Sequence, residues 1–175
     1  MGIRVVLWDK VGQCGAPDLR RRSAFMGDLE QMFLGHYDHT IDDKGRLTVP
    51  ARFRDLLADG AVITLGFDGN LIVMTSAMFD DFSSRLDKMN MTNPDSRSLR
   101  RMILSFAERL ELDRVGRILL PQFLRQQASL VTNAIIAGVG DYFEIWSPEL
   151  WARQVSLLQD PEVNAQRFAA LDLSA

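Results

Sequence analysis

Two Asp–Arg pairs with the same spacing are the residues of this chain best suited to do chemistry. The motif consists of Asp42, Gly45 and Arg46 in one copy and Asp113, Gly116 and Arg117 in the other. In a tight turn, an aspartate can accept backbone N–H bonds and hold a guanidinium in a forked pair. An arginine braced in this way loses fewer rotamers when it meets a phosphate or a guanine edge. The motif therefore indicates recognition of an anion or a nucleic acid.

A purely structural explanation competes with this one, because an isolated Asp–Arg pair often does no more than stabilise its turn. The second occurrence favours a binding role, since a stabilising partner need not be arginine both times. The two turns differ in charge: Lys44 adds a positive charge to the first, whereas Val115 stands at the matching position of the second. The sequence therefore predicts that the first loop is the better anion binder and that Arg46 contributes more than Arg117.

The motif belongs to a longer repeat. Residues 42–54 return as residues 113–125, with one constant offset at five chemically distinctive positions. Besides the motif itself, Pro50 matches Pro121 and Arg54 matches Arg125. The chain is therefore two copies of one supersecondary unit, and its function is expected to need both.

Further arginines near the repeats have two explanations each. Those that follow the prolines are Arg52, Arg54 and Arg125, and those between the repeats are Arg97, Arg100 and Arg101. A row of charges on an amphipathic helix is usually its solvated face. Contact with DNA or with a neighbouring subunit is the other explanation, and both stay open for these residues.

The elements that must position the motif can be predicted from the repeat. Gly45 and Gly116 stand where a tight turn needs a positive φ. Pro50 and Pro121 suit the first turn of a helix. The predicted strands are 33–41, 47–49, 62–66 and 71–74 in the first copy and 107–112, 118–120, 134–138 and 142–146 in the second. The predicted helices are 51–58, 122–129 and those beginning near Ser76 and Ser147.

The segment between the two copies predicts one more helix. Asn93 can cap it, with Pro94 and Asp95 in its first turn. Its apolar stripe at helical spacing consists of Leu99, Met102, Ile103, Phe106 and Leu110. The resulting organisation is an extension at 1–31, a first repeat at 32–90, a linker helix at 91–106, a second repeat at 107–155 and a tail at 156–175. The extension is expected to be poorly ordered or to precede the true start at Met32, and a DNA-touching basic arm is the alternative.

Composition narrows the classes of function. The chain has 175 residues, a net charge of −3 and one cysteine, Cys14, so an internal disulfide is impossible. No apolar run is long enough to cross a bilayer. His36 and His39 lack the further ligands of a metal site, and no phosphate-binding loop is present. We expect no metal, no cofactor and no enzymatic activity, and a reducing, cytosolic setting fits the cysteine count.

The quoted motifs resemble those of the MraZ family of bacterial regulators, which are related to AbrB-like regulators and to certain antitoxins. The resemblance covers residues 32–155 and rests on the segment from Met32 to Gly35, on both Asp–Arg turns and on the prolines that follow them. It implies an α+β fold that is mainly β with flanking helices: a tandem-repeat, double-split β barrel with pseudo-two-fold symmetry. It also implies a ring-shaped homo-oligomer.

The functional implication is a sequence-specific, DNA-binding transcriptional regulator of the cytoplasm and nucleoid. The resemblance assigns DNA contact to Arg46 and Arg117, braced by Asp42 and Asp113, on direct repeats in front of a division and cell-wall gene cluster. Repressor and activator roles both stay open. The alternative is an antitoxin-like protein-interaction module that binds double-stranded DNA weakly.

Overall fold

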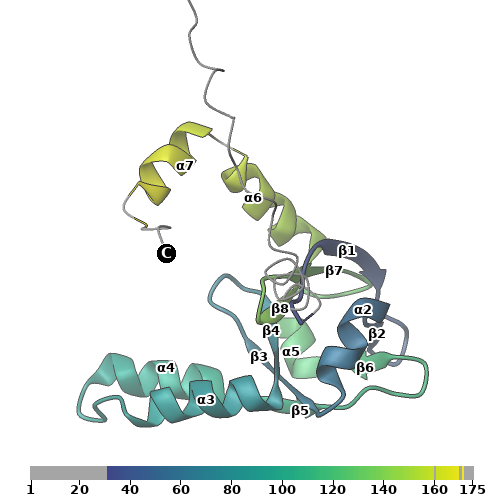
Figure 1. The fold of residues 1–175 in the computed structure, drawn as a ribbon, viewed down its shortest axis with the longest axis horizontal. Coiled ribbons are helices and arrows are strands. Elements are labelled where there is room, and N and C mark those ends of the chain that lie inside the picture. Colours follow the sequence, from purple (N-terminus) through teal and green to yellow (C-terminus); the bar gives the residue numbers. More distant parts are fainter. Residues whose placement is uncertain (1–30, 160, 170, 172–175) are drawn as a thin grey trace, which may run out of the picture. The chain divides into compact units, whose positions relative to one another are not determined.

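The computed structural model describes residues 31–159, 161–169 and 171 (Figure 1). The expected extension therefore lies, apart from Gln31, outside the described residues, as does Cys14. The first copy contains β1 (His36–Thr40), β2 (Arg46–Thr48), α2 (Ala51–Arg54), the 3-10 helix η1 (Asp55–Leu57), β3 (Ala61–Leu65), β4 (Leu71–Thr75) and α3 (Ser76–Asp87). The linker is α4 (Pro94–Leu104). The second copy contains β5 (Glu108–Leu110), β6 (Arg117–Leu119), α5 (Gln122–Gln127), β7 (Asn133–Gly138), β8 (Tyr142–Trp146), α6 (Pro148–Leu158) and α7 (Pro161–Phe168).

The strands of the two copies interleave rather than forming two separate sheets. A six-stranded antiparallel sheet has the order β1-β7-β8-β4-β3-β5, and a separate two-stranded sheet joins β2 to β6. Thus β1 of the first copy pairs with β7 of the second, and β4 pairs with β8. The predicted α+β class and tandem repeat are confirmed. Among the described strands the pairing is split and does not close into a continuous barrel, because β1 and β5 lie at the two ends of the larger sheet.

One hydrophobic core joins both copies, and matching residues contribute to it. From the first copy come Leu47, Val49 and Phe53, and from the second Ile118, Leu120 and Leu124, all of them buried. The alternation of strand side chains explains this, since Leu47 and Val49 face inward while Arg46 and Thr48 face outward. The ring of Phe53 also packs edge-on against Phe33 at a centroid distance of 5.0 Å. The pseudo-two-fold arrangement therefore has its centre in the core beneath β2 and β6.

The linker helix is capped as predicted but ends earlier than its apolar stripe. Asn93 Oδ1 accepts a bond of 2.8 Å from the Asp95 backbone N–H, with Pro94 in the first turn. The helix spans Pro94–Leu104, so the cap at Asn93 is confirmed but the predicted range 91–106 is too long at both ends. The Ser105 hydroxyl bonds back to the Arg101 carbonyl, which competes with helix continuation. Leu110, expected on the same stripe, instead lies in β5 opposite Ala61, because β3 offers backbone partners there.

Helices α3 and α4 lie side by side next to β3 (Figure 1). At the other end of the chain, Ser147 caps α6 as predicted, and α7 occupies part of the predicted tail at 156–175. None of the helices in the described ranges is both long and apolar enough to span a membrane.

Candidate nucleic-acid interface

Strands β2 and β6 form a short antiparallel ribbon with one buried and one outward face. Arg46 lies opposite Leu119, Leu47 opposite Ile118, and Thr48 opposite Arg117. The central pair is buried in the core. The other four side chains, which are those of Arg46, Thr48, Arg117 and Leu119, share the outward face. We call this surface the ribbon face.

The first Asp–Arg turn leads directly into the ribbon. Asp42 Oδ1 accepts backbone N–H bonds from Lys44 (3.0 Å) and Arg46 (2.9 Å). Asp42 Oδ2 accepts from Arg46 Nε at 2.7 Å and lies 2.7 Å from Arg46 Nη2. Gly45 adopts a φ of +79°, as the sequence predicted. One carboxylate therefore fixes both the backbone of the loop and one side of the guanidinium.

The second turn repeats this arrangement. Asp113 Oδ1 accepts from the backbone N–H groups of Val115 (3.0 Å) and Arg117 (2.9 Å). Asp113 Oδ2 accepts from Arg117 Nε at 2.8 Å and lies 2.7 Å from Nη2. Gly116 has a φ of +80°. The bracing geometry expected for both aspartates is therefore present, and in both loops it holds the Nε side of the guanidinium.

Contacts between the copies place the two arginines in one cluster. The Leu120 N–H donates to the Gly45 carbonyl, and the Val49 N–H donates to the Gly116 carbonyl, both at 2.9 Å. Arg117 Nη1 also lies 3.6 Å from Asp42 Oδ2, so one carboxylate faces both guanidiniums. Among the described residues, Arg46 makes no matching ion pair with Asp113.

The electrostatics of the cluster favour its charged state. The Arg46 side chain, through its hydrogen bond, is the largest cause that lowers the pKa of Asp42 to about 2. The backbone N–H of Arg117 is the largest cause that lowers the pKa of Asp113. The hydrogen bond to Asp42 raises the pKa of Arg46 in turn. The arginine side chains remain about 30% exposed, so they are charged, held and accessible at neutral pH.

Arg54 and Arg125 support the loops from inside. Arg54 Nε donates to the Val49 carbonyl (2.9 Å), and Arg125 Nε donates to the Leu120 carbonyl (3.1 Å). Each side chain lies over the motif glycine of the other copy, Arg54 over Gly116 and Arg125 over Gly45. These two arginines therefore pack the two copies against each other. Arg52, by contrast, is exposed and donates to the Tyr37 hydroxyl at 3.3 Å.

The linker arginines are not brought to the ribbon face. Arg97 Nη1 donates to the Met91 and Thr92 carbonyls, both at 2.9 Å. Arg100 donates to the Leu86 carbonyl at 3.0 Å and pairs with Asp87 at 2.7 Å. The Arg100 contacts join α4 to α3, and the Arg97 contacts join α4 to the loop before it. Arg101 is exposed at the C-terminal end of α4.

Sequence reasoning missed one charge at the loop tips. Arg114 occupies the position that Asp43 holds in the first copy, and both are exposed. The first loop therefore carries two acids and two bases, whereas the second carries one acid and two bases. The difference is visible in the sequence, because Asp43 and Arg114 are equivalent positions of the repeat, next to Lys44 and Val115. Lys44 alone predicted that the first loop is the better anion binder. The full set of charges in the two loops does not favour the first loop in this way.

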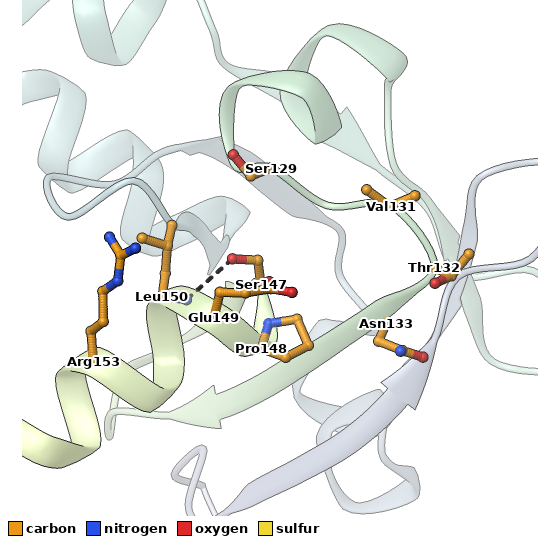
Figure 2. Close-up of a pocket in the computed structure, with 9 residues that line it drawn as sticks. All are labelled: Ser129, Val131, Thr132, Asn133, Ser147, Pro148, Glu149, Leu150 and Arg153. Carbon is orange, nitrogen blue, oxygen red and sulfur yellow. Dashed lines mark hydrogen bonds between the residues drawn. The ribbon is translucent and has the colours of Figure 1, made fainter.

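A polar pocket lies elsewhere, at the start of α6 (Figure 2). It encloses about 400 Å³ and is lined by Ser129, Val131, Thr132, Asn133, Ser147, Pro148, Glu149, Leu150 and Arg153. The Ser147 hydroxyl accepts the Leu150 N–H at 3.4 Å, which is an ordinary helix cap. None of these lining residues belongs to the two Asp–Arg turns. In the part of the chain that the structure describes, no group of three or more His, Cys, Asp or Glu side chains is placed to hold a metal.

Comparison with known proteins places this geometry in a family. The family model described as "MraZ protein, putative antitoxin-like" matches the chain twice, at residues 32–102 and 103–172. A protein of Roseiflexus castenholzii named "Transcriptional regulator MraZ" is 46% identical over 138 residues, which cover 79% of this chain and 94% of that protein. Proteins of the same name from Thermomicrobium roseum and Ligilactobacillus salivarius are 45% identical over 142 residues (80% and 99%) and 43% identical over 120 residues (69% and 84%). The chain belongs to the MraZ family.

Proposed function

We propose that the chain is a sequence-specific, DNA-binding transcriptional regulator whose reading surface is the ribbon face. The relatives named above are called transcriptional regulators. The observation that carries the proposal is the pair of braced guanidiniums, Arg46 and Arg117, which share Asp42 on one outward surface. Lys44 and Arg114 at the loop tips extend the same surface toward phosphates.

The bracing leaves the outer edge of the Arg46 guanidinium available, whereas Nη1 on the outer edge of Arg117 also lies 3.6 Å from Asp42 Oδ2. Aspartate holds Nε and one proton of Nη2, so the outer edge formed by Nη1 and Nη2 points away from its own loop. That edge presents the two parallel donors that match guanine O6 and N7. The major groove of DNA also admits a two-stranded β ribbon. A bidentate contact of this kind discriminates against a wrong base by about 1–3 kcal/mol.

The expected target is a set of direct repeats in the promoter of a division and cell-wall gene cluster, and the expected setting is the cytoplasm and nucleoid. The chain carries a net charge of −3, so a single copy with a few arginine contacts would bind weakly at physiological salt. A homo-oligomeric ring that presents many ribbon faces to many repeats would gain affinity through effective concentration.

Assembly and repeat number can be tested together. Light scattering should give a mass of several chains, and affinity should rise steeply from DNA with one repeat to DNA with several. A monomer, or an affinity that does not depend on repeat number, would contradict the oligomeric part of the proposal and leave DNA recognition to be judged separately.

The test of DNA recognition compares two labelled duplexes of equal length and composition. One is the fragment upstream of the gene cluster, and the other is a shuffled version of it. Fluorescence anisotropy at two salt concentrations should give tighter binding to the upstream fragment by at least about a thousandfold, the lower range for specific DNA binders. Equal affinities would contradict the proposal.

The description of the matching family model as antitoxin-like favours a second candidate, a protein-interaction module with weak DNA binding. This candidate expects the same low affinity for both duplexes, together with a protein partner whose binding is insensitive to changes at Arg46 and Arg117. The anisotropy measurement therefore separates the two candidates directly.

A further inference from the structure

The ribbon face has an internal symmetry that is broken at one pair of positions. The operation that exchanges β2 and β6 brings Arg46 onto Arg117 and Thr48 onto Leu119. The arginines occupy two opposite corners of the face, and the other two side chains occupy the remaining corners. On this face the two strands therefore differ at one pair of equivalent positions: β2 has Thr48 where β6 has Leu119.

Leu119 is unusual for an outward strand residue. It is 58% exposed, although its neighbours Ile118 and Leu120 are buried in the core. A single exposed leucine on a protein surface normally needs no explanation. Here, however, it lies directly opposite Arg46 on the surface that carries both guanidiniums, and the equivalent place in the other copy is filled by a threonine, which a solvated strand accommodates well.

The geometry of the pair relates its two side chains to neighbouring base pairs. Residues directly opposite in an antiparallel ribbon have Cβ atoms roughly 5 Å apart. Base pairs are stacked about 3.4 Å apart along the helix axis. Side chains that leave the ribbon as Arg46 and Leu119 do can therefore reach adjacent base pairs, one through donors and the other through an apolar surface.

We propose that Leu119 contacts the C5-methyl group of a thymine next to the base pair read by Arg46. This inference rests on the proposed function and adds a specificity-determining residue to it. In the major groove the thymine methyl is the apolar group that distinguishes its base pair. Thr48 beside Arg117 selects less strongly, because its small methyl can also contact a thymine but its hydroxyl donates to or accepts from other bases. The ribbon face therefore reads DNA in one direction, although its arginines are arranged symmetrically.

The test removes single methyl groups from the DNA. Within the footprint of the chain on the upstream fragment, each thymine is replaced in turn by deoxyuridine, which lacks only the C5-methyl group. We expect affinity to fall about fivefold at one position per repeat, the equivalent of ~1 kcal/mol and close to the burial of one methylene group. In Leu119→Ala this sensitivity should disappear, whereas in the matched control Thr48→Ala it should persist.

The outcomes separate this inference from the function on which it rests. If the unaltered chain binds the upstream fragment but no deoxyuridine substitution weakens it, or if Leu119→Ala keeps the same sensitivity, the role of Leu119 is overturned and DNA recognition stands. If the unaltered chain does not prefer the upstream fragment at all, both are overturned. Because Leu119 is exposed, the unfolding curve of Leu119→Ala should match that of the unaltered chain.

Discussion

The loop at residues 42–46 and the loop at residues 113–117 have the same backbone conformation and the same Asp–Arg pair, but the residues around that pair differ. Asp42 faces both guanidiniums, whereas Asp113 pairs, among the residues that the structure describes, with Arg117 alone. The tip of the first loop carries Asp43 and Lys44, and that of the second carries Arg114 and Val115. Duplication has thus kept the bracing that holds each arginine and has left the residues around it to diverge.

The largest expected effect comes from removing either guanidinium. Arg46→Ala and Arg117→Ala should each lower affinity for the upstream fragment by about 10- to 100-fold, the range of one lost bidentate contact. Because Arg114 compensates for Val115 in the charge balance, we expect the two losses to lie within a few-fold of each other. Gel-shift titrations check this, and a much larger loss for Arg46→Ala would support the ranking made from Lys44.

Replacing the two motif glycines, Gly45 and Gly116, by alanine should lower the free energy of unfolding by different amounts. Alanine at either position adopts a positive φ, which costs about 1–3 kcal/mol. In Gly116→Ala the new Cβ also overlaps the middle of the Arg54 side chain, which its bond to Val49 holds in place. In Gly45→Ala the Cβ lies 3.0 Å from Nη2, 3.1 Å from Cζ and 3.2 Å from Nε of Arg125, which are tight contacts without the overlap seen at Gly116. Urea unfolding should show the larger loss for Gly116→Ala, and the reverse order would contradict the interlocked arrangement.

A smaller effect should come from the charges at the loop tips. Lys44→Ala and Arg114→Ala should each weaken binding several-fold on any DNA sequence and reduce the slope of log affinity against log salt by about 0.9. Equal slope changes would mean that the two tips approach phosphates alike. An unchanged slope in either variant would remove that tip from the interface. Arg101→Ala, on α4, is the matched control and should leave the slope unaltered.

The smallest expected effect is on stability in acid. The pKa of Asp42 is lowered from its ordinary 3.8 to about 2, so its contribution to stability is present above about pH 4 and is lost as the pH falls toward 2. Asp42→Asn should therefore lower the melting temperature at pH 5 and differ little from the unaltered chain near pH 2. Asp113→Asn should show a smaller change of the same kind, because Asp113 pairs with one arginine among the described residues. If the difference in melting temperature between Asp42→Asn and the unaltered chain were the same at pH 2 as at pH 5, the ion pair of Asp42 with Arg46 would not be the cause.

Local features of the fold were predictable because their causes are local. The positive φ of Gly45 and Gly116 follows from the turn, and the caps at Asn93 and Ser147 follow from side chains that bond to nearby N–H groups. The Asp–Arg fork of each loop was also predictable, since its partners lie four residues apart.

Features that depend on distant parts of the chain were not predictable in the same way. The pairing of β2 with β6 brings the two loops together, and only the folded chain shows that Asp42 faces Arg117. For Arg54 and Arg100 the sequence left a solvated face and a contact with DNA or a neighbouring subunit open, and in the structure they donate to the carbonyls of Val49 and Leu86. Such carbonyls at turns and helix ends carry no sequence signal, because every residue has one.

The central claim is that a braced guanidinium fork, not positive charge alone, reads the DNA sequence. The most direct test is the double variant Arg46→Lys with Arg117→Lys, which keeps both charges but removes the planar fork. We predict that its affinity for shuffled DNA stays within about threefold of the unaltered chain, since counterion release depends on charge. Its preference for the upstream fragment should fall by at least about 100-fold, the loss of two bidentate contacts. An unchanged preference would contradict the account.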